Sequence, residues 1–251
     1  MNSVRPSSAL KSNARDQLLG HYSVAILAFL AMESIIFFVT LFSTSFSDTT
    51  TAFGIIIYLL ITLILQLLAG VFTVGETQLY LNIACSKKPE VANIFTGFIH
   101  HPDKSILVQF FLMLIGTLPL LPAGLFAALY YFTENPLLIL LTAVFFAAGM
   151  ICMVVLYLHY SQVFCLMLDF PHYTVAELFA ESKKLMMGHC FELFYLKVSF
   201  IPLFLAAFMT CGIGLLWVIP YRNATHISFF LDLVKTNVTE PDSGIFINET
   251  C

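Results

Sequence analysis

The chain is dominated by long apolar runs separated by short polar segments. Each run is at least as long as the roughly 20 residues that a helix needs to cross the hydrocarbon core of a bilayer. Because no water is available there to satisfy the backbone, a helix is the expected conformation. The four clearest runs lie at about residues 22–42, 53–83, 105–131 and 136–168.

The last apolar stretch, from Cys190 to Val234, allows two interpretations. It forms either one span that ends at Val218 and is followed by a surface helix, or two spans at about 190–210 and 213–234. The two-span arrangement would hinge at Cys211-Gly212-Ile213-Gly214.

Some polar segments have the pattern of amphipathic helices. Apolar side chains at spacings of three and four form one stripe over residues 175–186, with the charged side chains off it. Thr174 and Glu177 have the spacing of a capping box, which predicts the start of this helix. A similar stripe covers residues 91–99, and a weaker one covers 8–19. We expect these helices at the membrane interface, supporting the bundle; a docking platform for lipid headgroups or a partner is the alternative.

The sequence also repeats weakly, at an interval of about one third of the chain. Val91–Phe95 matches Val175–Phe179 at this interval, and Leu18–His21 matches Met186–His189 at twice the interval. Three units, each an amphipathic helix followed by a membrane hairpin, would account for nearly the whole chain. Chance matching in a sequence rich in Leu, Phe and Ala is the alternative explanation.

Composition agrees with a membrane protein. Of the 251 residues, 59% are apolar or aromatic and only 10% are charged, whereas a soluble domain carries about 25% charged residues. With a mean hydropathy of +0.91, the chain has more apolar surface than a soluble fold could bury. The 11 basic and 15 acidic residues also exclude a nucleic-acid binder and a disordered chain. The expected fold is therefore an all-α, polytopic transmembrane helix bundle.

The distribution of basic residues predicts the orientation. If the N-terminus is cytoplasmic, most Lys and Arg side chains fall on the cytoplasmic face, and the outer loops 43–51 and 132–135 contain none. This distribution of basic residues is compatible with both five and six spans. We expect six, because the third repeat unit needs a second span. Residues 1–236 would form one membrane domain, followed by a short polar tail at 237–251.

Polar residues inside the apolar runs are the candidate functional residues, since each costs at least about 2.5 kcal/mol at a helix centre. Glu33 and Arg222 both fall near the predicted midplane, so we expect them to form a pair that fixes two spans or binds a zwitterionic or anionic ligand group. A second polar cluster is expected toward the cytoplasmic side. It comprises Glu76, Gln78, His159, Gln162, Glu192 and Lys197.

Several short motifs in the first and last parts of the chain resemble a bacterial integral-membrane family known as domain of unknown function 975. They are Ala9-Leu10-Lys11, Ala14-Arg15 and Leu19-Gly20, then Cys165–Pro171, Glu181–His189, Ser199-Phe200-Ile201, Gly212–Trp217 and Pro220-Tyr221. Pro202 departs from the Gly-Trp that the family pattern has at this place. The family is similar to the membrane domains attached to glycerophosphodiester phosphodiesterases, where the final span ends in the cytoplasm. The resemblance implies a bacterial inner membrane and six spans, and no activity.

No catalytic or cofactor motif is present, so we expect neither an enzyme nor a bound cofactor. The six cysteines lack CxxC or metal-ligand spacing, so neither a metal site nor a disulfide framework is expected. The favoured function is a non-enzymatic membrane protein that binds lipid or assists other membrane proteins. A small transporter or exporter of an amphiphilic or zwitterionic solute is the alternative. Membrane lipids, and other membrane proteins, are the expected partners, and nucleic acid is not.

Overall fold

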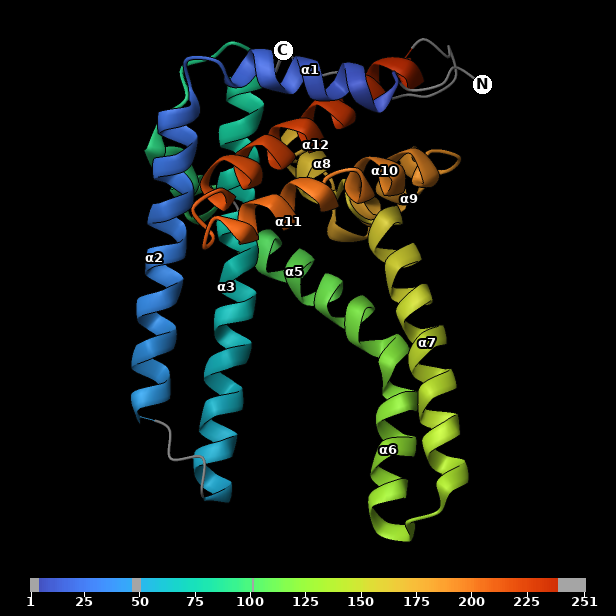
Figure 1. The fold of residues 1–251 in the computed structure, drawn as a ribbon. Helices are drawn as coiled ribbons and strands as arrows, with labels where there is room; N and C mark the ends of the chain where they lie inside the picture. The colour runs from blue at the N-terminus through green and yellow to red at the C-terminus, as the bar shows by residue number, and fades with distance from the viewer. Residues whose placement is uncertain (1–4, 47–50, 101, 239–251) are drawn as a thin grey trace.

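The computed structural model describes residues 5–46, 51–100 and 102–238, and within these ranges all regular structure is helical (Figure 1). Two long helical hairpins extend from the same end of the molecule, with their tips at the other end (Figure 1). The first pairs α2 (Tyr22–Phe46) with α3 (Ala52–Ala84). The second pairs α5 (Pro102–Thr117) and α6 (Leu121–Thr133) with α7 (Pro136–His159). These bounds confirm the four clearest runs of the sequence.

The descending arm of the second hairpin bends between α5 and α6. A single 3-10 turn, η2 (Leu118–Leu120), joins the two helices. Pro119 lies in this turn and Pro122 at the start of α6. Proline lacks a backbone N–H and its ring clashes with the preceding turn of a helix, so a bend is expected there.

Short helices gather at one end of the hairpins, which we call the α1 end. They are α1 (Ser7–Leu18), η1 (Val91–Phe95), α4 (Thr96–Ile99), α8 (Val163–Asp169) and α9 (Val175–Met186). The capping box that begins α9 is present, with the Thr174 side chain and the Glu177 side chain bonding reciprocally to the backbone.

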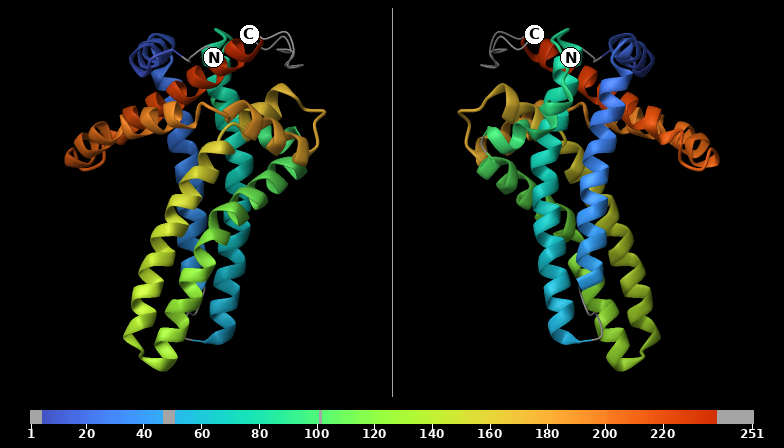
Figure 2. Two further views of the ribbon diagram at one scale, coloured as in Figure 1. Left: turned by 90° about the vertical axis from the view of Figure 1, so that its right-hand side faces the viewer. Right: turned by 90° about the vertical axis from the view of Figure 1, so that its left-hand side faces the viewer.

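The last three helices lie across the long hairpins rather than beside them. They are α10 (Cys190–Val198), α11 (Ile201–Met209) and α12 (Leu215–Val238). Figure 2 shows that α11 and the start of α12 extend sideways from the bundle, while the end of α12 returns to the α1 end.

Helix positions follow the interval of the sequence repeat. The helices α1, η1 and α9 begin at Ser7, Val91 and Val175, which are equally spaced along the chain. The returning helices α3 and α7 begin at Ala52 and Pro136, separated by the same interval. Each short helix is followed by a hairpin, so the fold has the three-unit organisation that the sequence predicts.

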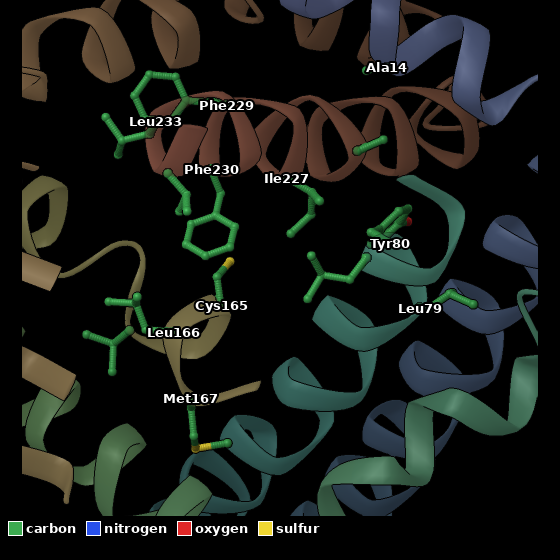
Figure 3. Packing of buried hydrophobic residues seen from close by; sticks show 14 of the residues in the cluster. Ala14, Leu79, Tyr80, Cys165, Leu166, Met167, Ile227, Phe229, Phe230 and Leu233 are labelled. Atoms are coloured by element: carbon green, nitrogen blue, oxygen red, sulfur yellow. The ribbon is translucent and has the colours of Figure 1, made fainter. Parts of the chain in front are cut away.

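The best-packed core lies at the α1 end and joins the first and third units. Phe229, Phe230 and Leu233 of α12 are fully buried, and so is Leu18 of α1. Figure 3 shows Phe230 pointing from α12 toward Cys165 of α8. Here α12 packs against α1, α2 and α3, so the last helix closes the fold onto the first.

Elsewhere the hairpins expose large apolar side chains. Phe38 is 66% exposed, Phe53 73%, Leu140 61% and Tyr131 81%. The surface of a water-soluble protein does not carry so continuous an apolar area, whereas the acyl chains of a bilayer can cover it. The exposed surface identifies these hairpins as membrane-embedded.

Five helices of the described residues are long and apolar enough to cross a membrane. They are Tyr22–Phe42, Phe53–Ala84, Pro102–Thr133, Pro136–Asp169 and Cys190–Met209. The sixth expected span corresponds to α12, which is not among them. Polar and charged residues such as Arg222, Asn223 and Asp232 lower its hydropathy, and its second half is buried against α1 rather than facing lipid.

Candidate functional site

A groove opens between α7 and the α10–α11 segment, with a volume of about 280 Å³. Its lining side chains are hydrophobic or aromatic except for one that is charged. The residues that line it are Met153, Val154, Tyr157, Leu158, Phe194, Lys197, Val198 and Ile201. A surface of this composition suits an acyl chain, and its single cation suits a negatively charged group at one place along that chain.

Lys197 projects from α10 into this groove, with its amine 4.4 Å from the centre of the Tyr157 ring. A cation over an aromatic face gains about 0.5–2 kcal/mol, which is less than the Coulombic attraction of a counterion in contact with it in an apolar setting. Among the residues that the structure describes, no carboxylate lies within 4.0 Å of this amine. Within the described ranges, the groove therefore contains a cation with no carboxylate at ion-pair distance.

Arg222 lies nearby on α12, within electrostatic reach of Lys197. Its guanidinium donates to Asn223 Oδ1 at 3.0 Å and lies 5.8 Å from the ring of Phe204. The residue is exposed. The helix α11 and the start of α12 form a third, shorter hairpin. Two cations from neighbouring helices, Lys197 and Arg222, thus lie close to each other at its base.

His226 is one turn further along α12, outside the five candidate spans. Desolvation, followed by the charges of Lys197 and Arg222, lowers the pKa of His226 to about 3. The ring is therefore neutral at physiological pH. Its Nε2 lies 3.3 Å from the side-chain amide nitrogen of Gln162, whose side chain is fully buried. This contact fixes α12 against the start of α8.

The predicted pair of Glu33 and Arg222 is not joined in an ion pair within the described part of the chain. Glu33 is exposed on α2, and Arg222 bonds to Asn223 instead. Both are within electrostatic reach of a third residue, Glu76 of α3. Glu76 accepts a hydrogen bond from Asn223 Nδ2 at 2.6 Å. Asn223 was not predicted as a site residue, although its polar side chain near the predicted midplane was the available signal.

The predicted cytoplasmic-side cluster is brought together only in part: Gln162 contacts His226, which lies within electrostatic reach of Lys197, whereas other members bond elsewhere. Gln78 bonds to Asn82 on its own helix at 3.1 Å. Glu192 pairs with His189 at 2.9 Å. The side chain of His159 bonds to the Val155 carbonyl, and Cys190 Sγ lies 3.7 Å from its ring. Of the six predicted residues, Lys197 alone lines the groove.

The interfacial helices are tied to the bundle by hydrogen bonds. Lys104 Nζ at the start of α5 donates to the carbonyl of Pro171 at 2.6 Å and to that of Tyr173 at 3.2 Å. At the N-terminus of α9, hydrogen bonds from the backbone and side chain of Thr174 lower the pKa of Glu177. The α9 cap therefore holds a carboxylate, as the helix dipole favours.

No group of three metal-ligating side chains occurs in the described ranges. Cys152, Cys165, Cys190 and Cys211 are free thiols. Cys85 takes part in a disulfide. None was expected from the sequence, because spacing along the chain does not show which cysteines meet in space.

The fold and its exposed apolar surface define an all-α, multi-pass membrane protein. The chain belongs to the family described as protein of unknown function (DUF975), whose model matches residues 1–237. No curated protein and no solved structure matches it. The family match supports the main resemblance seen in the sequence. The likeness to the membrane domains of glycerophosphodiester phosphodiesterases and the bacterial origin find no support.

Proposed function

We propose that this protein binds a membrane phospholipid in the groove between α7 and α10. The apolar walls would hold part of an acyl chain, and the Lys197 amine would bind the phosphate. The observation that carries the proposal is the amine in an apolar groove, without a carboxylate at ion-pair distance in the described chain.

The energetics favour an anionic ligand group. A charged side chain in an apolar membrane setting costs at least about 2.5 kcal/mol, and a charge-assisted bond to a phosphate offsets part of this cost. Arg222 adds a second positive charge in the vicinity, although it also faces Glu76. Lys197 is therefore the better candidate for the direct contact.

The proposed orientation places the α1 end in the cytoplasm of a bacterial cell, at the inner membrane. Supporting it, Lys11, Arg15 and Lys183 lie on α1 and α9 at this end. The opposite tip of the second hairpin carries Glu134 and no basic residue between Phe132 and Asn135. This asymmetry follows the rule that basic residues stay on the cytoplasmic side.

The proposed role is non-enzymatic, with no cofactor or metal. Lipid binding could serve neighbouring membrane proteins, and the interfacial helices α1 and α9 are the candidate surface for such partners. Transport of an amphiphilic or zwitterionic solute is the second candidate. The observation that favours it is the cluster of Glu76, Asn223 and Arg222, because polar groups within membrane segments often line a solute path.

Native mass spectrometry of the protein released from lipid nanodiscs tests the lipid proposal. The comparison is between wild type, Lys197→Gln and the control Lys183→Gln, which removes an exposed amine of α9 that does not line the groove. A discrete phospholipid retained by wild type and by the control, but lost from Lys197→Gln, is the expected result. Equal retention by all three proteins would refute the assignment. Lys197→Arg, which keeps the charge, should retain the lipid.

A further inference from the structure

The third hairpin differs from the second in the length of its uncharged segment. The segment between Lys197 and Arg222, residues 198–221, contains no Asp, Glu, Lys, Arg, His, Asn or Gln. It forms both arms and the tip of the hairpin. Its length can therefore be compared with the thickness of a membrane.

A helix rises 1.5 Å per residue, so two arms of about 12 residues reach about 18 Å. The hydrocarbon core is about 30 Å thick. The arms of the second hairpin are longer: residues 105–133 lie between Lys104 and Glu134, enough for about 43 Å of helix. The second hairpin can cross the core and return. The third could reach at most about half of this thickness even if its arms ran along the membrane normal, and they lie across the long hairpins instead (Figure 2).

The tip of the third hairpin suits an apolar environment. Its most exposed side chains are hydrophobic, with Met209 87%, Phe208 64% and Ile213 62% exposed. By contrast, the tip of the second hairpin carries the exposed charged residue Glu134. A tip in water would not be expected to present this apolar surface, but a tip among acyl chains would.

The backbone of the turn is also bonded internally. Cys211 and Gly212 adopt left-handed conformations, with φ of 53° and 84°. The amide of Gly212 donates to the carbonyl of Ala207 at 3.3 Å, and that of Gly214 donates to Thr210 Oγ1 at 2.9 Å. The Thr210 hydroxyl donates in turn to the Ala207 carbonyl at 2.7 Å. Within hydrocarbon an irregular backbone needs such partners, because water cannot supply them.

The two ends of the uncharged segment lie close to each other. Lys197 and Arg222 are within electrostatic reach of each other, although the whole hairpin separates them in the sequence. Cations at the ends of a membrane segment are stabilised at the headgroup layer, where they contact phosphates and water. One headgroup layer can therefore receive both ends of the hairpin.

We infer that residues 198–221 form a re-entrant hairpin, which enters one leaflet from the face of the membrane at the α1 end and leaves by the same face. The tip of the hairpin lies among the acyl chains of that leaflet. Its partner is the hydrocarbon layer of that leaflet. The chain then crosses the membrane four times, and both α1 and the end of α12 lie on the same side. This inference does not rest on the lipid groove, because it concerns the path of the backbone.

Sidedness of Cys211 tests this path. In a variant with every other cysteine replaced by Ser, a membrane-impermeant maleimide should fail to label Cys211 from either side and should label it after detergent is added. Two control positions calibrate the sides. With Cys211 also replaced by Ser, Lys183→Cys on α9 should react from the α1 side, and Glu134→Cys at the second tip from the opposite side.

Labelling of Cys211 from the Glu134→Cys side would show a full crossing and overturn the inference. Labelling from the Lys183→Cys side would place the tip in water and overturn it as well.

Wild-type protein provides an independent readout, because Trp217 is the only tryptophan and is 51% exposed. In vesicles with brominated phosphatidylcholine in one leaflet, its fluorescence should fall only when bromine is in the α1-side leaflet. Quenching from the opposite leaflet alone would refute the hairpin.

Discussion

The side-chain amide of Asn223 donates a hydrogen bond to the Glu76 carboxylate at 2.6 Å, and this contact joins the third unit of the fold to the first. Asn223 lies on α12 and Glu76 on α3, far apart in the sequence. Both side chains are removed from most of the solvent, so neither can easily exchange its partner for water.

Removing the Asn223 amide should destabilise the protein. We expect Asn223→Leu to lower the free energy of unfolding by about 1–3 kcal/mol, because the Glu76 carboxylate loses a donor without gaining water. Thermal unfolding in detergent measures the effect. The double variant Asn223→Leu with Glu76→Leu should recover part of the loss, since the carboxylate is removed together with its donor and the exposed Arg222 can be hydrated instead. An unchanged unfolding temperature in the single variant would contradict this account.

Close helix packing around α3 depends on Gly75. A Cβ at this position would collide with the backbone carbonyl of Ile94 in η1, and backbone cannot move aside as a flexible side chain can. We expect Gly75→Ala to lower stability by at least about 1–3 kcal/mol, the usual cost of overpacking. Gly116→Ala is the matched control, because nothing lies within 4 Å of its added Cβ. Equal unfolding temperatures for the two variants would show that η1 does not pack on α3 as described.

The stability of the protein should depend on pH through His226. The pKa of this ring is about 3 in the folded protein against about 6.5 when unfolded, so the unfolded chain binds more protons between these values. Stability is then greatest above about pH 6.5 and is lost as pH falls toward 3. In His226→Gln, unfolding temperatures measured from pH 7 to pH 4 should fall less steeply than in wild type. The same substitution at the exposed His172 is the control, and identical slopes for wild type and His226→Gln would contradict the prediction.

Arg5 and Asp232 fasten the first helix to the last. The Arg5 backbone N–H and Nε donate to the two carboxylate oxygens at 2.8 and 2.6 Å. Asp232→Ala removes both bonds and should cost more than Arg5→Ala, which keeps the backbone bond. The Arg5 side chain is 49% exposed, so solvent screening limits its share to about 0–1 kcal/mol. Trypsin cleavage within α1, at Lys11 or Arg15, should be faster in Asp232→Ala than in Arg5→Ala. Equal rates in the two variants would contradict a stabilising contact between Arg5 and Asp232.

Much of the fold could be predicted because it depends on local patterns. Long apolar runs gave the bounds of α2 and α3 to within a few residues, since span length is set by membrane thickness. Thr174 and Glu177 located the start of α9 because the capping box is a contact between neighbours in sequence. The repeat interval anticipated the helix positions of all three units.

The contacts between distant helices could not be predicted in the same way. Counting residues estimates the depth of Glu33 in its span but not the direction that its side chain takes around the helix axis. The expected partner, Arg222, bonds to Asn223 instead. The direction of the third hairpin was not predicted for another reason. Hydropathy identifies residues that suit a membrane, but it does not give the direction of a helix. The number of residues between Lys197 and Arg222 limits how far the hairpin can extend into the membrane.

Occupation of the groove beside Lys197 by a phospholipid can be measured by photolabelling. A phospholipid with a photoreactive acyl chain tests it most directly when wild type and Lys197→Gln are labelled side by side and their peptides are compared. We expect enriched labelling of Met153–Leu158 and Phe194–Ile201 over the outer faces of α2 and α6, and loss of that enrichment in the variant. The same labelling pattern in both proteins, uniform over all lipid-facing helices, would contradict it.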